Sequence, residues 1–129
     1  MEKILNGSTV ENIIDSDLDK VVNQMLHYEH DFHRGRAIIL IGIRINEDYP
    51  KYSQLLLTEM NKDIHFLGVR LGVKSAWTIA VALIENLKAE DYPKIKKEFD
   101  KWDKEEKEGL LDWLKDFPDH LKILKEGKL

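Results

Sequence analysis

The stretch His27–His33 is the densest cluster of potential metal ligands in the chain, with three histidines and two acidic residues in seven positions. On a helix, His27 would lie beside His30 and Asp31, because residues three and four positions apart are neighbours. Imidazole and carboxylate at this spacing can chelate a divalent metal. The established signatures, His-Glu-x-x-His and Glu-x-x-His, are absent. Further ligands would have to come from a second helix, where Glu59, Asp63 and His65 are available.

The proposed metal ligands are therefore His27, His30 and Asp31, with a divalent metal as the only cofactor that the sequence suggests. The alternative is a hydrated helix end whose polar side chains bind no metal.

A second unusual feature is that all four arginines lie between residues 34 and 70. Arg44 interrupts an apolar stretch, and Arg70 stands between two aliphatic residues. A buried guanidinium without a partner is very costly, so each of these needs a carboxylate or an anionic ligand. One interpretation is an Arg–Glu ion pair between helical hairpins, with Glu85 or Glu59 as partner. The other is an anion or phosphate pocket, whose candidate residues are Arg36, Arg44, Arg70 and Glu85.

Motifs for catalysis are otherwise missing. The segment 68–75, GVRLGVKS, lacks the Gly-Lys-Ser order of a phosphate-binding loop, and the acidic stretch 15–19 lacks the glycine of a calcium loop. Ser53, Thr58 and Ser75 have no identifiable base beside them in the sequence. We expect a protein that is not an enzyme.

Composition narrows the class of protein further. The chain has 129 residues, 43% of them hydrophobic and 34% charged, a net charge of −4 and no cysteine. Disulfides and thiolate metal sites are thus excluded, and an acidic balance argues against a protein that binds nucleic-acid backbone. The longest apolar run, Ala37–Ile43, is far shorter than the roughly 20 residues that cross a bilayer. With no signal-peptide pattern, we expect a cytoplasmic protein that does not bind membranes.

Apolar spacing predicts helices along the whole chain. The sequence Ser8-Thr9-Val10-Glu11 has the form of a capping box. The three-and-four apolar spacing after it predicts a first helix from about Thr9 into the low thirties, with a break possible near residues 15–17. The segment 37–45, AIILIGIRI, fits either a buried strand or a buried helix.

An internal repeat decides between these two alternatives. The sequence EDYPK at residues 47–51 recurs at residues 90–94, 43 residues later, and apolar positions before it match at the same offset. The later copy follows a clearly helical segment, 75–87, so the segment 37–45 should be helical too. Each unit then consists of a helix, a short turn with Tyr-Pro, and a second helix.

We therefore predict an all-α fold in a single domain, residues 1–129. It should be a compact bundle of about six helices containing a duplicated helical hairpin, with units at about 34–72 and 75–108. The alternative is a coincidence around a common Asp-x-Pro helix start.

The segment 75–117 combines a small apolar helix, an acidic turn, a lysine-rich amphipathic helix and a closing Leu-Leu-Asp-Trp-Leu helix. This pattern resembles the C-terminal half of bacterial all-helical immunity proteins against polymorphic nuclease toxins. The resemblance covers about a third of the chain and implies a non-enzymatic helical protein that binds a toxin through an acidic surface.

Two functions follow from these observations. The first is a helical protein-interaction module, either an immunity-type inhibitor or a homo-oligomeric protein, whose partner is another protein or itself. Its candidate contact residues are Glu90, Asp91, Asp100, Trp102, Asp103 and Glu106. The alternative is a helical protein that processes nucleic acids or nucleotides through the metal and phosphate sites described above. A pocket for a small ligand between the hairpins, in which one or two arginines hold a carboxylate, is a further alternative.

Overall fold

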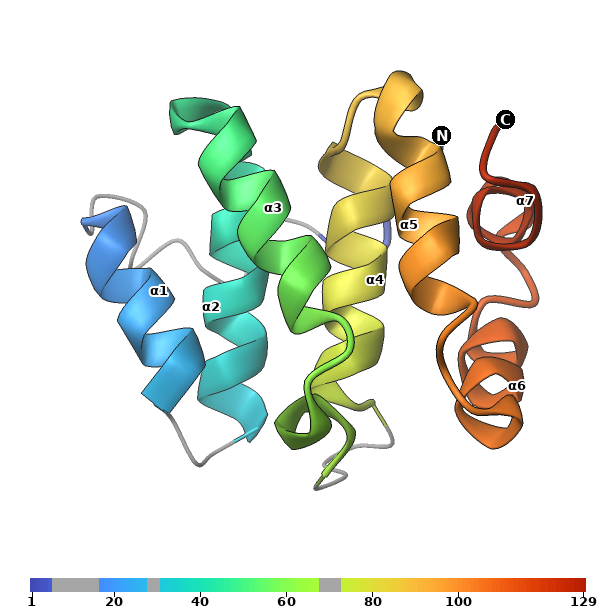
Figure 1. Ribbon diagram of the computed structural model, residues 1–129, viewed down its shortest axis with the longest axis horizontal. Coiled ribbons are helices and arrows are strands. Elements are labelled where there is room, and N and C mark those ends of the chain that lie inside the picture. The colour runs from blue at the N-terminus through green and yellow to red at the C-terminus, as the bar shows by residue number, and fades with distance from the viewer. Residues whose placement is uncertain (6–16, 28–30, 68–72) are drawn as a thin grey trace.

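A computed structural model describes residues 1–5, 17–27, 31–67 and 73–129 of the chain. The protein is an all-α compact bundle, with seven α-helices and no strand of regular sheet in the described residues (Figure 1). The helices are α1 (Leu18–His27), α2 (Asp31–Ile43), α3 (Tyr49–Glu59), α4 (Ser75–Asn86), α5 (Tyr92–Phe99), α6 (Lys104–Trp113) and α7 (Pro118–Glu126). Short 3-10 turns occupy Ile45–Glu47, Asp63–Phe66 and Ala89–Asp91.

Sequence signals set most helix ends. Asp48 caps α3 by accepting a hydrogen bond from the backbone N–H of Lys51, and Pro50 occupies the first turn, where a missing N–H leaves nothing unpaired. Asp103 caps α6 in the same way through the N–H of Glu106. At the other end of the chain α7 stops at Gly127, whose φ of 73° is readily adopted only by glycine.

The centre of the molecule is α4, in which ten of twelve residues are buried. It packs against α2, α3, α5 and α7, while α2 also packs against α1. In Figure 1, α3 crosses in front of α2 and lies between α1 and α5, and α6 and α7 lie beyond α5. A Cβ added at Gly42 would lie 3.2 Å from the Cβ of Ala82, so α2 approaches α4 closely because both residues are small.

The ambiguous segment is helical, since α2 runs through Ala37 and ends at Ile43. One prediction about the first helix is wrong: α1 ends at His27, and residues 31–33 begin a second helix, α2. The predicted start near Thr9 lies outside the described residues. The two units have the same order of elements at the predicted offset, because α2 and α4 end 43 residues apart and α3 and α5 begin 43 residues apart. Duplication as the origin of this correspondence stays a prediction.

None of the helices in the described part of the chain is long and apolar enough to cross a lipid bilayer.

Candidate interaction surface

Two adjacent hollows, of about 340 and 410 Å³, follow the seam between α3 and α5. A third, of about 310 Å³, lies just past the C-terminal ends of both helices. The first and second share Gln54, Leu57 and Lys94, and the second and third share Lys101. They therefore form one elongated depression, which we call the α3–α5 trough. Its lining comprises Tyr49, Pro50, Ser53, Gln54, Leu57, Thr58, Asn61, Asp63, Phe66, Asp91, Lys94, Lys97, Glu98, Lys101, Trp102, Asp103 and Glu106.

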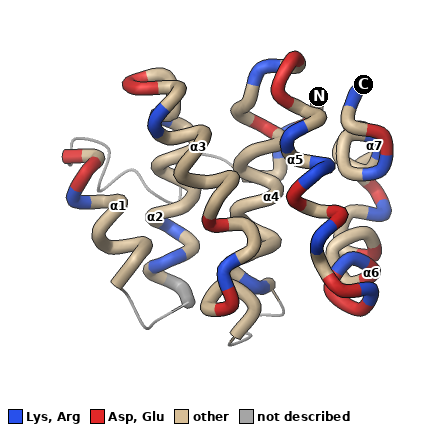
Figure 2. The backbone as a smooth tube through the Cα atoms, in the orientation of Figure 1, with Lys and Arg blue, Asp and Glu red and all other residues tan. Residues whose placement is uncertain are grey.

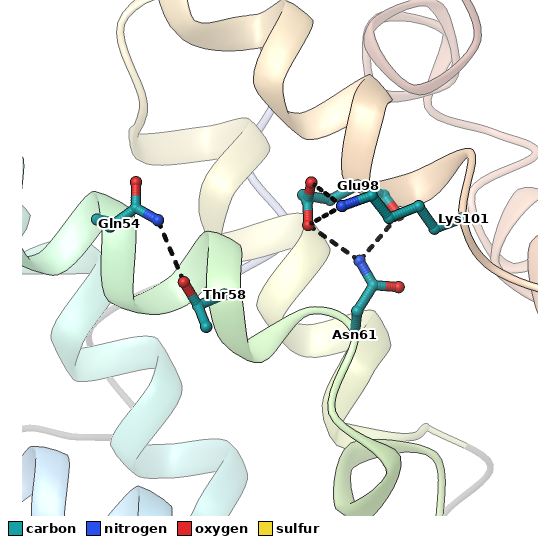
Figure 3. A network of polar contacts seen from close by, with 5 residues as sticks. All are labelled: Gln54, Thr58, Asn61, Glu98 and Lys101. Carbon is teal, nitrogen blue, oxygen red and sulfur yellow. Dashed lines mark hydrogen bonds and ion pairs between the residues drawn. The ribbon is translucent and has the colours of Figure 1, made fainter.

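The two walls of the trough differ in chemistry (Figure 3). The α3 side carries uncharged polar groups, and Gln54 donates to the hydroxyl of Thr58 across 3.2 Å. At the end of that wall the side-chain amide of Asn61 donates to the backbone carbonyl and the carboxylate of Glu98, across 3.1 and 3.2 Å. Glu98 also accepts from the ammonium of Lys101 at 2.9 Å. Only the bonds of Asn61 to Glu98 join the two walls, because the other two lie within one wall each.

One end of the trough is built around Tyr49. Its hydroxyl donates to a carboxylate oxygen of Asp91 at 2.7 Å and accepts from the backbone N–H of Lys88 at 2.9 Å. Burial and the neighbouring Asp91 carboxylate raise the pKa of Tyr49 to about 12, although the N–H of Lys88 works in the opposite direction. The hydrogen bond from Tyr49 and the ammonium of Lys94 lower the pKa of Asp91.

Asp91 occupies the position in the second unit that Asp48 occupies in the first, yet its side chain does not cap α5. The neighbouring Tyr49 competes for this carboxylate and binds it, so one motif serves as a cap in the first unit and as a link between units in the second.

The opposite end is built around Trp102, which is 5% exposed. Its ring meets Phe66 and Phe99 edge to face, at centroid distances of 5.1 and 5.2 Å. Beside it, Glu106 forms an ion pair with Lys74. The third hollow is therefore an aromatic base surrounded by acidic side chains.

Charge changes sign along the trough. The middle hollow is lined by three lysines and one glutamate, whereas the hollow at Trp102 is lined by one lysine and three acidic residues. Figure 2 shows this dense mixture of charge on α5 and α6, in contrast to α4, whose only charged residue is Glu85.

Four of the six predicted partner-binding residues line this one trough: Asp91, Trp102, Asp103 and Glu106. Glu90 and Asp100 are exposed but line none of the three hollows, and Asp100 forms an ion pair with Lys96. The structure adds that Trp102 is a packing residue and that Asp91 and Glu106 already have partners. The α3 wall was missed by the sequence analysis, because Ser53, Gln54 and Thr58 carry no signal of their own and matter only through their position opposite α5.

Among the described residues of the proposed arginine site, Arg44 and Glu85 each bind partners other than one another. Arg44 lies outside α2, in the turn after it, and forms a bidentate ion pair with Glu47, three residues away. The expectation of an Arg44 within an apolar helix is thus wrong, because the helix ends one residue earlier. Arg36 is half-buried in α2, and Arg70 lies outside the described residues.

Glu85 has other partners than an arginine. Its side chain is 1% exposed and accepts a hydrogen bond from Nε2 of His120, on α7, at 2.6 Å. The backbone N–H groups of Ile4 and Leu5 donate to the same carboxylate across 2.7 and 3.0 Å. One buried carboxylate therefore joins the N-terminal residues, α4 and α7. The sequence signal was an acid on the apolar face of a helix, and its partners could not be read from spacing.

Of the three predicted metal ligands, the structure describes the side chain of His27 alone. His27 is exposed, and its Nδ1–H donates to the carbonyl of Asn23 at 2.9 Å. His30 and the side chain of Asp31 are outside the described part of the structure, so this site stays a prediction. The described side chains contain no group of three potential ligands.

Two of the three further ligands considered for that site, Glu59 and His65, bind each other. Glu59, 2% exposed, accepts from Nε2 of His65 at 3.0 Å and from Lys62 at 2.7 Å. Burial acts to raise the pKa of Glu59, but these two donors outweigh it and the pKa is lowered. The pair ties the end of α3 to the following turn.

Compared with known proteins, the chain matches no family model, no curated protein and no solved structure.

Proposed function

We propose that this protein is a non-enzymatic helical interaction module that binds a protein partner along the α3–α5 trough. The observation that supports it is the gathering of four of the six predicted contact residues on one elongated depression. Asp91 lies before α5 and the other three lie after it, so they mark the two ends of the depression. A depression of this length offers contact area that a single small hollow lacks.

The rigidity of the walls favours the same function. The bonds from Tyr49 to Asp91 and from Asn61 to Glu98 join α3 to the region of α5 at both ends of the trough. A surface whose shape is held before binding loses less conformational entropy when a partner docks. The partner is a second protein in the immunity-type form of this proposal and another copy of the chain in the homo-oligomeric form.

Site-specific photo-cross-linking tests the proposal. A benzoylphenylalanine replaces Gln54, which is exposed on the α3 wall, and in a second variant replaces Lys122, which is exposed on α7 and lines none of the three hollows. Irradiation of cells that express the protein should yield a defined protein adduct from position 54 and none from position 122. Mass spectrometry then identifies a foreign partner or a second copy. Adducts from position 122 alone, or from neither position, would contradict the proposed binding face.

A further inference from the structure

We infer that the α3–α5 trough accepts an extended peptide segment whose acidic side chains alternate along it, with the backbone facing α3 and the carboxylates facing the lysines of α5. This inference rests on the proposed function and specifies the chemistry of the partner.

The first argument is the charge that remains available in the trough. Most acidic side chains of the trough already have partners within the protein. Asp91 binds Tyr49 and Lys94, and Glu98 binds Asn61 and Lys101. Glu106 binds Lys74, and Asp103 caps α6. In contrast, Lys97 is exposed, and none of the described acidic side chains forms an ion pair with it. The side chains of Lys94 and Lys101 are 65% and 55% exposed, and each ammonium group carries three donors, so each can bind a second carboxylate.

The second argument is spacing. Lys94 and Lys97 lie on α5, and Lys101 lies in the turn that follows it. At about 1.5 Å per residue, the row from Lys94 to Lys101 covers roughly 10 Å. Side chains on one face of an extended chain recur every two residues, about 6.7 Å apart. Two or three acidic residues at alternate positions therefore match the length of the lysine row.

The third argument is the chemistry of the opposite wall. An extended segment has backbone N–H and C=O groups that need partners once water is displaced. Ser53, Gln54 and Thr58 carry hydroxyl and amide groups that can both donate and accept. Leu57, 7% exposed, supplies an apolar floor shared by two hollows. The acidic hollow at Trp102 would repel phosphates and carboxylates alike, so the acidic residues of the segment must lie in the middle hollow, beside the three lysines. A nucleic-acid strand fits less well, because its phosphates recur at every nucleotide and would continue into the acidic hollow.

Fluorescence anisotropy tests this inference with three labelled probes at about 50 mM salt: an eight-residue peptide of alternating Glu and Ser, its counterpart with Lys in place of Glu, and an eight-nucleotide thymidine strand. We expect the acidic peptide to bind most tightly and to bind more weakly as salt is raised. Lys97→Glu should weaken binding about tenfold or more, which corresponds to about 1.4 kcal/mol. Lys122→Glu makes the same charge change on α7 and should leave binding unchanged.

Tighter binding of the basic peptide or of the thymidine strand would overturn the inference, as would an acidic peptide whose affinity is equal in wild type and Lys97→Glu. These results are separate from the cross-linking experiment. A partner captured from position 54 through a basic segment would leave the proposed function standing and reject the acidic peptide. Absence of any adduct from position 54 would reject both.

Discussion

At the scale of single residues, Glu85 is the group whose alteration should matter most for stability. The Glu85 carboxylate accepts hydrogen bonds from three N–H groups. Replacement by Gln keeps the shape of the side chain but replaces one acceptor oxygen with an NH2 group, which is a donor and cannot accept any of these bonds. We expect Glu85→Gln to lower the free energy of unfolding by about 1–3 kcal/mol, measured by urea denaturation. Glu90→Gln, at an exposed site on the turn before α5, is the matched control and should change it by less than about 0.5 kcal/mol. Equal effects would show that the buried network contributes nothing.

Tyr49 carries a second residue-scale prediction, this one about pH. Its pKa of about 12 in the folded protein lies above the ordinary value of 10.0, so the fold favours the neutral phenol. The contribution of the neutral Tyr49 phenol to the free energy of unfolding is therefore complete below pH 10 and is lost as the pH rises from 10 to 12. In a spectrophotometric titration of phenolate, the step near pH 12 should disappear in Tyr49→Phe. A variant that retains the whole step would show that another tyrosine produces it.

At the scale of elements, two helical glycines should respond oppositely to the same substitution. A Cβ at Gly35 in α2 would meet nothing within 4 Å, whereas at Gly109 in α6 it would lie 2.8 Å from the ring of Trp77. Gly35→Ala should therefore stabilise the protein by about 0.5–1 kcal/mol through helix propensity. Gly109→Ala gains the same propensity but crowds the contact with α4, so we expect a net loss of about 1 kcal/mol.

Thermal denaturation of the two variants side by side checks this pair. If Gly35→Ala and Gly109→Ala both stabilise the protein, Trp77 must move aside at no cost in free energy. The contact between α6 and α4 would then not require a glycine at position 109.

At the scale of the whole molecule, stability should be greatest at α4 and least at the periphery. Ten of twelve residues of α4 are buried, against one, Leu110, in α6. Amides in buried, well-packed helices exchange only on global unfolding, whereas peripheral helices open locally. Native-state hydrogen exchange should thus find the slowest amides in α4 between Ile79 and Ile84, and faster exchange in α6. Equal protection in both helices would contradict this order.

The placement of the termini is also decided at this scale. Figure 1 shows both chain ends on the side of the molecule near α5 and α7. Ile4 and Leu5 pack against the core there, and Glu85 binds their backbone. Contacts between residues 80 positions apart in the chain leave no periodic signal in the sequence.

The amino-acid sequence by itself determined the all-α class and much of the local structure. Apolar spacing, the Asp-x-Pro starts and Gly127 are local features, and helices form from local hydrogen bonds, so α3, α4 and α5 could be located from them. The repeat indicated that residues 37–43 are helical, although their composition alone also suited a strand. The boundary between α1 and α2 was missed, because the apolar periodicity continues across it.

Only the tertiary structure decided which side chains meet. Glu85 binds His120 and the N-terminal backbone, and Arg44 binds a nearby glutamate instead, because the choice of partner depends on how α4, α7 and the turns pack. The trough follows from the same cause: polar residues of α3 form one of its walls because packing places them opposite the lysines of α5. Residue types set which bonds are possible, and packing of distant segments selects among them.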